Sequence, residues 1–383
     1  MNTPVALFVF NRPGLTRLAV QRLAALRPSR LLVVADGPRS ESEAPLCLET
    51  RAALREGITW EVNVEFLENE GNLGCRRRFE SGLDWVFDRV DRAIILEDDI
   101  EVSPLFFEVA SKALERFHDA PEVRMISGHN VLVDYPEDAI PFFSRTGSIW
   151  GWATWADRWQ RYRRDFPQST DDEVLAGIAR HAASDVHARL QSHLFESRMW
   201  EKIDTWDMPW SIWGLASGGF CLNLPRNQSV NHGIGRDATH TTIEDDLRGH
   251  LPVRHWVPDD DALQSPPLRL EYDRAFSLLG LVLNYDEPRR WKVLAQRRDR
   301  LPARASGPGW EVMLSPFDHP EETAALIDHL RRHLPDRQLD LLAEVFPLGA
   351  GPAAIPLGNG PATLSLGNGP ATLSLADGPA TRR

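Results

Sequence analysis

The sequence predicts an α/β fold with a mostly parallel central sheet flanked by helices. Two features of the first hundred residues predict it. Short apolar segments of strand length alternate with stretches whose apolar residues recur at helical spacing, and the last apolar segment, 93–96, ends abruptly in Glu97, Asp98 and Asp99. Repeated strand and helix alternation is typical of parallel sheets with right-handed crossovers.

The expected elements follow in chain order. Polar turn residues close each strand, as at Asn11-Arg12-Pro13-Gly14 and Asp36-Gly37-Pro38, and a glycine-containing loop at 70–74 opens the third helix. We expect strands at 5–10, 31–35, 62–67 and 93–96, and helices at about 15–26, 46–56 and 76–87.

The carboxylates at the strand ends are the first candidates for a site. Ligands of open α/β sheets bind beyond the carboxyl ends of the strands, where Asp36 and the acidic triplet are expected. Glu97 and Asp99 share one side of the strand and Asp98 takes the other. One carboxylate could hold a divalent cation while its neighbour bonds a sugar hydroxyl or a base. The alternatives are a solvated acidic turn for the triplet and a simple turn-forming role for Asp36.

Three consecutive arginines, Arg76, Arg77 and Arg78, fall in the first turn of the third expected helix. The helix macrodipole does not favour cations at a helix N-terminus, so their presence indicates an anionic partner such as a diphosphate. The alternative is ordinary surface exposure, which is common for arginine.

Bulk composition excludes several classes of protein. The 383 residues carry a formal net charge of -12 and no long basic block, which argues against a nucleic-acid partner. Three scattered cysteines do not make a disulfide framework, and no apolar stretch reaches the length of a membrane span. We therefore expect a cytoplasmic protein without a transmembrane segment, at most peripheral to a membrane. Neither a lysine-containing phosphate loop nor a GxGxxG fingerprint is present, which disfavours kinases, ATPases and dinucleotide dehydrogenases.

The second half of the expected site is rich in tryptophan. The turn Trp150-Gly151-Trp152 could form a wall for a sugar ring, although a single tryptophan is more often a core residue. Asp207 lies between Trp206 and Trp210, an environment that suits a general base. Asp204 and Glu201 compete for that role, and Asp207 could instead be a helix cap or turn residue.

The stretch 215–224 is typical of the end of a helix that runs into a strand, and Asn231-His232-Gly233 follows it. His232 could ligate a metal or contact a diphosphate, while a purely structural histidine is the alternative. His240 is a weaker candidate for the same roles.

The segment 97–108, EDDIEVSPLFFE, resembles the acidic segment of N-acetylglucosaminyltransferase I and its relatives. These are metal-dependent, inverting nucleotide-sugar transferases of the GT-A fold. The segments 150–155, 231–235 and 238–240 resemble those of bacterial glycosyltransferases of the same broad group. The resemblance covers about residues 3–245 and is weak between 166 and 200.

This resemblance implies roles for the residues after the strands. Asp99 matches the metal ligand that bridges to the donor diphosphate through Mn²⁺, and Asp98 matches the acid beside it that contacts the nucleoside or sugar. Asp36 matches the acid that reads the uracil. Arg12 matches a basic residue near the nucleotide, and Arg78 loosely matches a basic residue after the third strand.

Asp207 matches the tryptophan-flanked catalytic acid of that family. With Glu97 and Trp152 added to the donor-binding set and His232 to the metal site, the expected protein is a GT-A-like glycosyltransferase. It would use Mn²⁺ or Mg²⁺ to move a hexosyl or N-acetylhexosaminyl group, with inversion, from a UDP-sugar to a hydroxyl of a glycan or glycolipid. Bacterial surface glycan synthesis is the expected context. The alternatives are a sugar-phosphate nucleotidyltransferase and a catalytically silent carbohydrate-binding protein.

The expected domain organisation has three parts. Residues 1–255 form the catalytic domain, with a nucleotide-binding half at 1–120 and an acceptor-side half at 121–255. Residues 256–348 form a helical extension, with helices expected at 275–284 and 321–333. Residues 349–383 hold a nine-residue repeat rich in glycine and proline, for which we expect disorder.

Overall fold

The computed structural model describes residues 2–136, 138–233, 251–259 and 261–284, and the short segments 312–314, 354–356, 362–365 and 371–375. The chain divides into two compact units. One comprises Met1–His181 with Leu194–Arg269, and the other comprises Ala182–His193 with Leu270–Arg383. Every predicted site residue belongs to the first unit, which also carries the central sheet. The three-part domain organisation stays a prediction.

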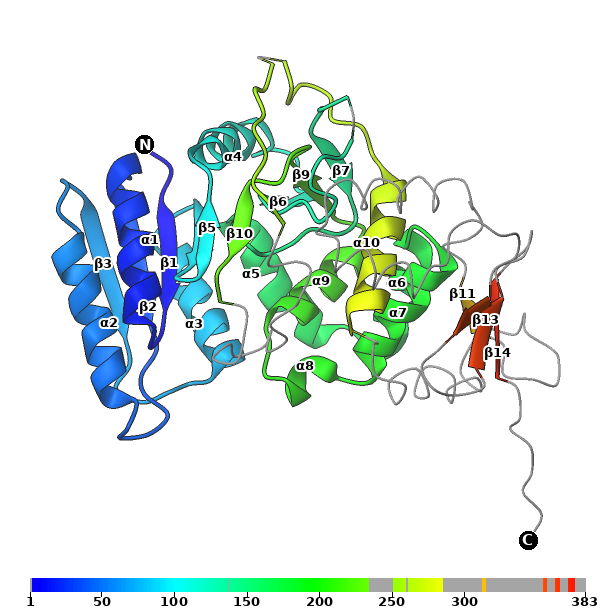
Figure 1. Cartoon of the computed structure of the whole chain (residues 1–383), viewed down its shortest axis with the longest axis horizontal. Coiled ribbons are helices and arrows are strands. Elements are labelled where there is room, and N and C mark those ends of the chain that lie inside the picture. Colours follow the sequence, from blue (N-terminus) through cyan, green and yellow to red (C-terminus); the bar gives the residue numbers. More distant parts are fainter. Residues whose placement is uncertain are drawn as a thin grey trace, which may run out of the picture. The chain divides into compact units, whose positions relative to one another are not determined.

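A mixed sheet of eight strands forms the centre of the first unit (Figure 1). Its order is β3-β2-β1-β4-β8-β6-β9-β7. The strands β3, β2, β1 and β4 run parallel, and β6 is parallel to β9, whereas β8 is antiparallel to β4 and β6, and β7 to β9. The predicted α/β fold with a large central sheet is confirmed. The strands are β1 (Val5–Val9), β2 (Arg30–Ala35), β3 (Asn63–Glu68), β4 (Arg92–Glu97), β6 (Val123–Ser127), β7 (Phe142–Ser144), β8 (Trp152–Trp155) and β9 (Phe220–Asn223).

The strand order places a topological switch point beside β1. The chain proceeds from β1 to β2 and β3 on one side, and then returns to lay β4 against the other side of β1, so that Val5 pairs with both Leu31 and Ile94. Ligands of open α/β sheets bind at such a point, beyond the carboxyl ends of the strands. In this protein the point lies between the end of β1 and the end of β4.

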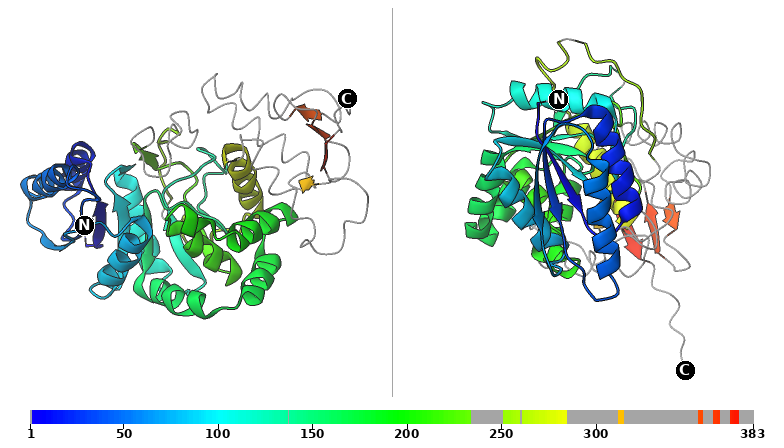
Figure 2. Two further views of the ribbon diagram at one scale, coloured as in Figure 1. Left: turned by 90° about the horizontal axis from the view of Figure 1, so that it is seen from below. Right: turned by 90° about the vertical axis from the view of Figure 1, so that its left-hand side faces the viewer.

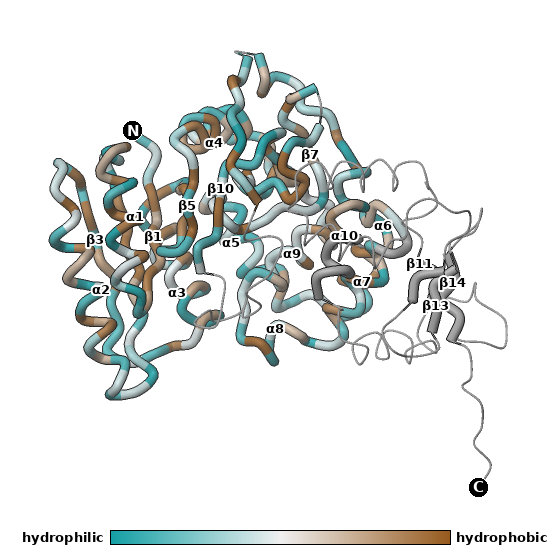
Figure 3. The backbone as a smooth tube through the Cα atoms, in the orientation of Figure 1, coloured by the Kyte–Doolittle hydropathy of each residue, from teal (hydrophilic) through white to brown (hydrophobic). Residues whose placement is uncertain are grey.

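Helices cover both faces of the sheet, because alternate residues of its buried strands point to opposite sides. Val5, Leu7 and Val9 pack with α1 (Pro13–Leu26), α2 (Ala44–Gly57) and α4 (Pro104–Arg116). Ala6 and Phe8 pack with α3 (Cys75–Phe87), α5 (Ala156–Asp165) and α9 (Asp207–Ala216). Figure 2 gives two further views of these layers, and Figure 3 shows that the strands carry the hydrophobic segments.

Four further helices and a two-stranded ribbon complete the regular structure of the main described region. The ribbon pairs β5 (Ile100–Val102) with β10 (Ser229–Asn231) in antiparallel fashion. The helices are α6 (Asp171–His181), α7 (Asp185–Glu196), α8 (Met199–Lys202) and α10 (Leu270–Asn284), and a short 3-10 turn, η1, spans Phe166–Gln168.

A stack of aromatic rings connects the sheet to the start of α9. Phe8 of β1 stacks on Phe79 of α3 at 4.2 Å between ring centroids, and Phe79 stacks on Trp206 at 5.0 Å. Trp206 also stacks on Trp152 of β8 at 5.5 Å. Because Trp206 is only 2% exposed, its burial holds the neighbouring Asp207 against this face of the sheet.

Of the two helices expected in the C-terminal region, the structure describes one. Helix α10 contains the expected helix at 275–284, whereas the expected helix at 321–333 lies outside the described residues. A second small sheet joins β11 (Val312–Leu314) to three strands of the repeat region, β12 (Ala354–Pro356), β13 (Ala362–Ser365) and β14 (Ala371–Leu375). Two Ala-Thr-Leu-Ser segments of the repeat, in β13 and β14, pair in antiparallel register, and the expected disorder of residues 349–383 stays a prediction.

Candidate functional site

The site begins with an ion pair across the switch point. Arg12 follows β1 and Asp99 follows β4, and the guanidinium Nη1 lies 2.5 Å from the carboxylate Oδ2. The two side chains are 22% and 12% exposed, so the pair is largely shielded from solvent. Burial opposes the charge of Arg12, but the carboxylates of Asp99, Asp98 and Glu97 outweigh it and raise the Arg12 pKa. The structure thus brings together two residues that the sequence placed at separate strand ends.

The second oxygen of Asp99 is an acceptor without a partner in the described part of the chain. Asp99 Oδ1 is buried and accepts no hydrogen bond there. A buried carboxylate oxygen is costly to leave unsatisfied, so this atom indicates a place for a donor or a cation. Carboxylate oxygen is also the ligand that Mg²⁺ and similar hard cations prefer.

The ribbon of β5 and β10 brings a third segment to this ion pair. Asn231 pairs with Ile100, and the backbone N–H of His232 donates to the Asp99 carbonyl at 2.8 Å. Gly233 then packs directly on the pair, since a Cβ on Gly233 would lie 1.9 Å from Asp99 Oδ2 and 2.8 Å from Arg12 Nη1. A larger residue at this position would require the Asp99 carboxylate to move. The sequence analysis identified this segment as a candidate because of His232. It did not predict the contact of Gly233 with the ion pair, because no local sequence pattern indicates it.

Replacing Gly233 with alanine is therefore expected to destabilise the protein by about 1–3 kcal/mol through overpacking. The same substitution should weaken binding of Mn²⁺, because the new methyl group displaces Asp99. Urea unfolding and a Mn²⁺ titration measure the two effects. Gly71→Ala is the matched control, since nothing lies within 4 Å of a Cβ at Gly71. Equal results for both variants would contradict this account of Gly233.

The His232 ring is directed to Glu101, in the strand that follows the acidic turn. His232 Nε2 lies 2.7 Å from Glu101 Oε2, and Glu101 also pairs with Arg22 of α1. Within the described residues no group of three or more His, Cys, Asp or Glu side chains is arranged to hold a metal ion. The assignment of His232 to the metal stays a prediction. His240 lies outside the described residues.

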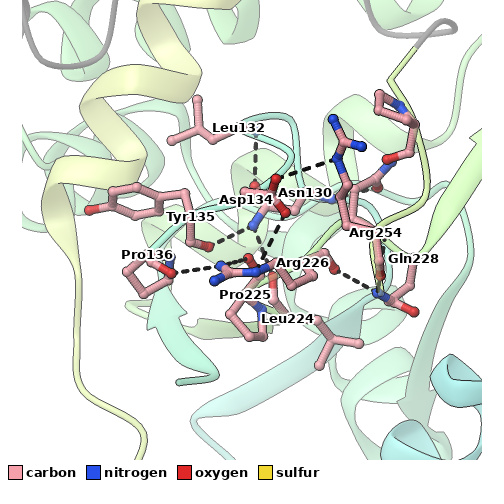
Figure 4. Close-up of polar contacts among 12 residues, drawn as sticks. Asn130, Leu132, Asp134, Tyr135, Pro136, Leu224, Pro225, Arg226, Gln228 and Arg254 are labelled. Atoms are coloured by element: carbon pink, nitrogen blue, oxygen red, sulfur yellow. Dashed lines mark hydrogen bonds and ion pairs between the residues drawn. The ribbon is translucent and has the colours of Figure 1, made fainter. Parts of the chain in front are cut away.

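A polar network fixes the chain that leads into β10 (Figure 4). Asp134 lies 3.5 Å from Arg226 and 3.4 Å from Arg254, and Gln228 Nε2 donates to the Arg254 carbonyl at 2.8 Å. Gln228 also accepts a hydrogen bond from Ser103 Oγ, and its carbonyl accepts from the Ser103 N–H at 2.8 Å. Ser103 caps helix α4 by accepting from the Phe106 N–H at 3.2 Å. The network thereby ties the start of β10 to the end of β5, which sets the register that delivers Gly233.

Asp98 is buried in the turn after β4, and the expected separation of Asp98 and Asp99 onto opposite sides stays a prediction. The Asp98 carboxylate accepts from Thr16 Oγ1, in the first turns of α1, at 3.2 Å. Burial, and then the charge of Asp99, raise the pKa of Asp98 to about 7. Its role in contacting the donor stays a prediction.

The raised pKa of Asp98 predicts a pH-dependent stability. A carboxyl whose pKa rises from 3.8 to about 7 on folding stabilises the folded protein at low pH, and this contribution is lost as the pH rises through 7. Asparagine imitates the neutral form, so metal-free Asp98→Asn should match wild type at pH 4 and be more stable than wild type at pH 8. Urea unfolding of wild type and variant at pH 4 and pH 8 measures this difference in stability, and Glu108→Gln, at an exposed position, is the control. An Asp98→Asn variant that is less stable than wild type at pH 8 would contradict the prediction.

Asp36 and Arg78 are occupied by contacts inside the protein. Asp36 accepts hydrogen bonds from the backbone N–H groups of Gly37 and Leu73 and from Asn72 Nδ2, which closes the turn after β2 onto the loop before α3. Burial outweighs these bonds and raises its pKa. Arg78 donates to the Leu67 carbonyl at 2.6 Å and to Asn69 at 3.3 Å. These contacts support the turn-forming interpretation of Asp36, and the donor-binding roles of both residues stay predictions.

Arg76 lies two residues before Arg78 in the run of three arginines. It pairs with Glu80, one turn along α3, at 3.0 Å. An anionic partner is therefore not needed to explain Arg76 or Arg78. The structure supplies acceptors for both from α3 and from the preceding strand and loop.

Asp207 is the first residue of helix α9. Thr205 Oγ1 donates a hydrogen bond to the Asp207 carboxylate. The preceding residue, Trp206, stacks on Phe79 of α3. The charge of Asp207 reaches Glu97: burial, then Asp99, Asp98 and Asp207, raise the pKa of Glu97 well above its usual value. Asp207 is therefore close enough to the end of β4 for its charge to act on Glu97, and its role as the base stays a prediction.

The two competitors for the role of base are placed differently. Asp204 Oδ2 accepts a hydrogen bond from the Cys75 N–H at 2.8 Å, at the start of α3, and its own backbone adopts a positive φ of 50°. Glu201 is exposed on α8. Asp204 is thus committed to capping α3.

The expectation for Trp152 needs correction. Its side chain is 1% exposed and packs against Trp206 and Trp210, at 5.5 and 5.8 Å between ring centroids. A fully buried indole cannot form an open wall for a sugar, so Trp152 supports the site from the core. Trp150, on the other side of Gly151, is partly buried and packs edge-on against His129 at 4.8 Å.

Within the described part of the chain, every helix is too short or too polar to cross a bilayer. No known family model matches the sequence, and no curated protein matches it. One solved structure to which the chain is similar is the mannosyltransferase PcManGT from Pyrobaculum calidifontis in complex with GDP-Man and Mn²⁺. It is 13% identical, with a TM-score of 0.29, and the match covers 90% of this chain and 79% of that one.

Proposed function

We propose that this chain is a metal-dependent glycosyltransferase that moves a sugar from a nucleotide-diphosphate sugar to an acceptor hydroxyl. The observation that carries the proposal is the meeting of Arg12, Asp99 and Gly233 at the topological switch point, with Glu97 and Asp207 beside them. This transfer needs a positively charged group, a carboxylate for the metal and a further carboxylate as the base. Arg12, Asp99, whose buried Oδ1 has no partner among the described residues, and Asp207 are the candidates for these roles. The resemblance of residues 97–108 to the acidic segment of such transferases supports the same conclusion.

The residues at the switch point suit a divalent cation bound together with a diphosphate. Asp99 offers the buried oxygen Oδ1, which has no partner among the described residues. Cations such as Mg²⁺ are commonly held by one or two carboxylates and by substrate phosphates. Bound Mn²⁺ or Mg²⁺ would neutralise negative charge on the departing diphosphate.

The chain's own residues then account for the transfer. Arg12 is placed to pair with a phosphate, and Glu97 and Asp98 offer acceptors to donor hydroxyls. Asp207 takes the proton of the acceptor hydroxyl as the oxygen attacks the anomeric carbon. The new carbon–oxygen bond forms as the bond to the diphosphate breaks, and the nucleoside diphosphate leaves with the bonding electron pair. A single displacement of this kind inverts the anomeric configuration.

The donor is proposed to be a UDP-sugar and the acceptor a glycan or glycolipid of a bacterial surface, following the same resemblance. The test is a panel of uridine, guanosine and thymidine diphosphate sugars incubated with the protein and Mn²⁺ or Mg²⁺. We expect release of nucleoside diphosphate, from slow hydrolysis or from transfer, and its loss with chelator. Omission of the protein gives the background.

The same assay separates the alternative functions. A nucleotidyltransferase would instead release pyrophosphate when given a nucleoside triphosphate and a sugar phosphate. A silent carbohydrate-binding protein would release neither product and would show no rise in melting temperature with nucleotide and Mn²⁺. Either result would overturn the proposed function.

A further inference from the structure

The Arg12–Asp99 ion pair occupies the carboxylate that the proposed function assigns to the metal. Arg12 Nη1 contacts Oδ2 at 2.5 Å, while Oδ1 of the same carboxylate is the atom without a partner among the described residues. A guanidinium and a divalent cation on one carboxylate repel each other strongly when both are shielded from water. Their joint presence on Asp99 is therefore unfavourable without additional negative charge.

Gly233 limits how this repulsion can be relieved. Its backbone packs on both members of the pair, so closely that even a Cβ would overlap Asp99 Oδ2 and approach Arg12 Nη1 to 2.8 Å. The His232 N–H also holds the Asp99 backbone, at 2.8 Å from its carbonyl. The ribbon thus contacts both the backbone and the carboxylate of Asp99, and Arg12 has the longer side chain with more rotatable bonds.

We infer that Arg12 is a built-in counter-ion that exchanges Asp99 for the donor diphosphate when the metal binds. This inference rests on the proposed function. In the ligand-free protein Arg12 neutralises Asp99 and so opposes binding of the metal alone. A diphosphate supplies the negative charge that both cations need, so metal and nucleotide each strengthen the binding of the other. Arg12 is a positioning residue in this scheme and makes the protein select the metal–nucleotide pair over free metal.

The scheme is tested by titrating Mn²⁺ into the full chain and measuring free Mn²⁺ by electron paramagnetic resonance, without nucleotide and with saturating UDP or GDP. In wild type we expect weak binding of Mn²⁺ alone, and tightening by nucleotide within the range of about 5- to 150-fold typical of coupled sites. Arg12→Gln removes the competing charge. It should bind Mn²⁺ alone more tightly than wild type, by up to a similar factor, and show a smaller effect of nucleotide.

Arg17→Gln is the matched control, because it removes an equal charge from the same helix. Arg17 pairs with Glu49 at the surface and makes no contact with Asp99, so this variant should behave as wild type. Arg12→Lys keeps a positive charge with poorer geometry and should bind Mn²⁺ with an affinity between those of wild type and Arg12→Gln. It serves as the second variant if Arg12→Gln does not fold, as judged by circular dichroism.

A purely structural Arg12 would give the opposite sign, since loss of a structural ion pair weakens metal binding. Metal affinity that is unchanged or lower in Arg12→Gln overturns the inference, as does Arg12→Lys binding Mn²⁺ more weakly than wild type. Failure of the proposed function looks different. Wild type would then bind no Mn²⁺ even with UDP or GDP present. If Mn²⁺ and nucleotide instead strengthen each other's binding equally in wild type and in Arg12→Gln, the proposed function stands and only the inference about Arg12 is refuted.

Discussion

Replacing Asp99 with asparagine is expected to reduce metal-dependent sugar transfer by about 10³-fold or more, because the substitution removes the charge that holds the cation at the diphosphate. Asparagine keeps the shape of the side chain, so the packing of Gly233 on this residue is preserved. The measurement is release of nucleoside diphosphate from the best donor of the panel, with Mn²⁺ varied up to saturation.

The control for Asp99→Asn is Glu108→Gln. Glu108 lies on α4, a few residues beyond the same acidic turn, and pairs with Lys112 at the surface. It should retain wild-type activity. Urea unfolding of Asp99→Asn shows whether the loss of the ion pair with Arg12 has unfolded the protein. Full activity of the folded Asp99→Asn variant in the presence of a chelator would refute the metal assignment.

Replacing Asp207 with asparagine is expected to lower kcat by about 10²- to 10⁴-fold, the usual contribution of a general base. Binding of donor and Mn²⁺ should remain, since neither depends on this carboxylate. The Trp206 anchor is untouched and Thr205 can still donate to an asparagine oxygen, so the start of α9 should keep its conformation. Steady-state kinetics at saturating donor measure kcat, and a Mn²⁺ titration with UDP measures binding.

The two competing acids provide the controls for Asp207→Asn. Glu201→Gln, on the exposed surface of α8, should leave kcat unchanged. Asp204→Asn should lower the free energy of unfolding, because a neutral amide oxygen accepts from the Cys75 N–H less strongly than a carboxylate does. If Glu201→Gln or Asp204→Asn reduces kcat as much as Asp207→Asn does while binding is retained, the assignment of the base is wrong.

The fold, and the sheet edge at which the site is proposed, follow from local patterns. The buried strand before Glu97 and the strand before Arg12 are visible as apolar runs, and general rules of α/β sheets place their ends at one edge. Contacts between distant segments could not be predicted in this way. The Arg12–Asp99 pair joins residues 87 positions apart, and the His232–Glu101 contact joins residues 131 apart.

Side-chain environments were the least predictable part. The sequence of Trp152 and its neighbours is compatible with a sugar-binding wall or with a core, and only the packing of α9 on β8 decides for the core. Asp36 likewise ends a strand at the expected edge, but the loop at 72–73 supplies its hydrogen-bond donors. A strand-end acid alone does not show whether a ligand or the protein itself will use its oxygens.

The position of β8 in the sheet has a consequence for synthesis of the protein. Because β8 lies between β4 and β6, the edge of β4 stays open on the ribosome until Trp155 has emerged. The acidic turn stays without its contact to Gly233 for longer still, because Gly233 is translated well after Asp99. A nascent chain that stalls between these points exposes an apolar strand edge, which is the kind of surface that chaperones bind and that aggregates form from. Slow translation across this interval should therefore lower the yield of native protein more than slow translation after Gly233.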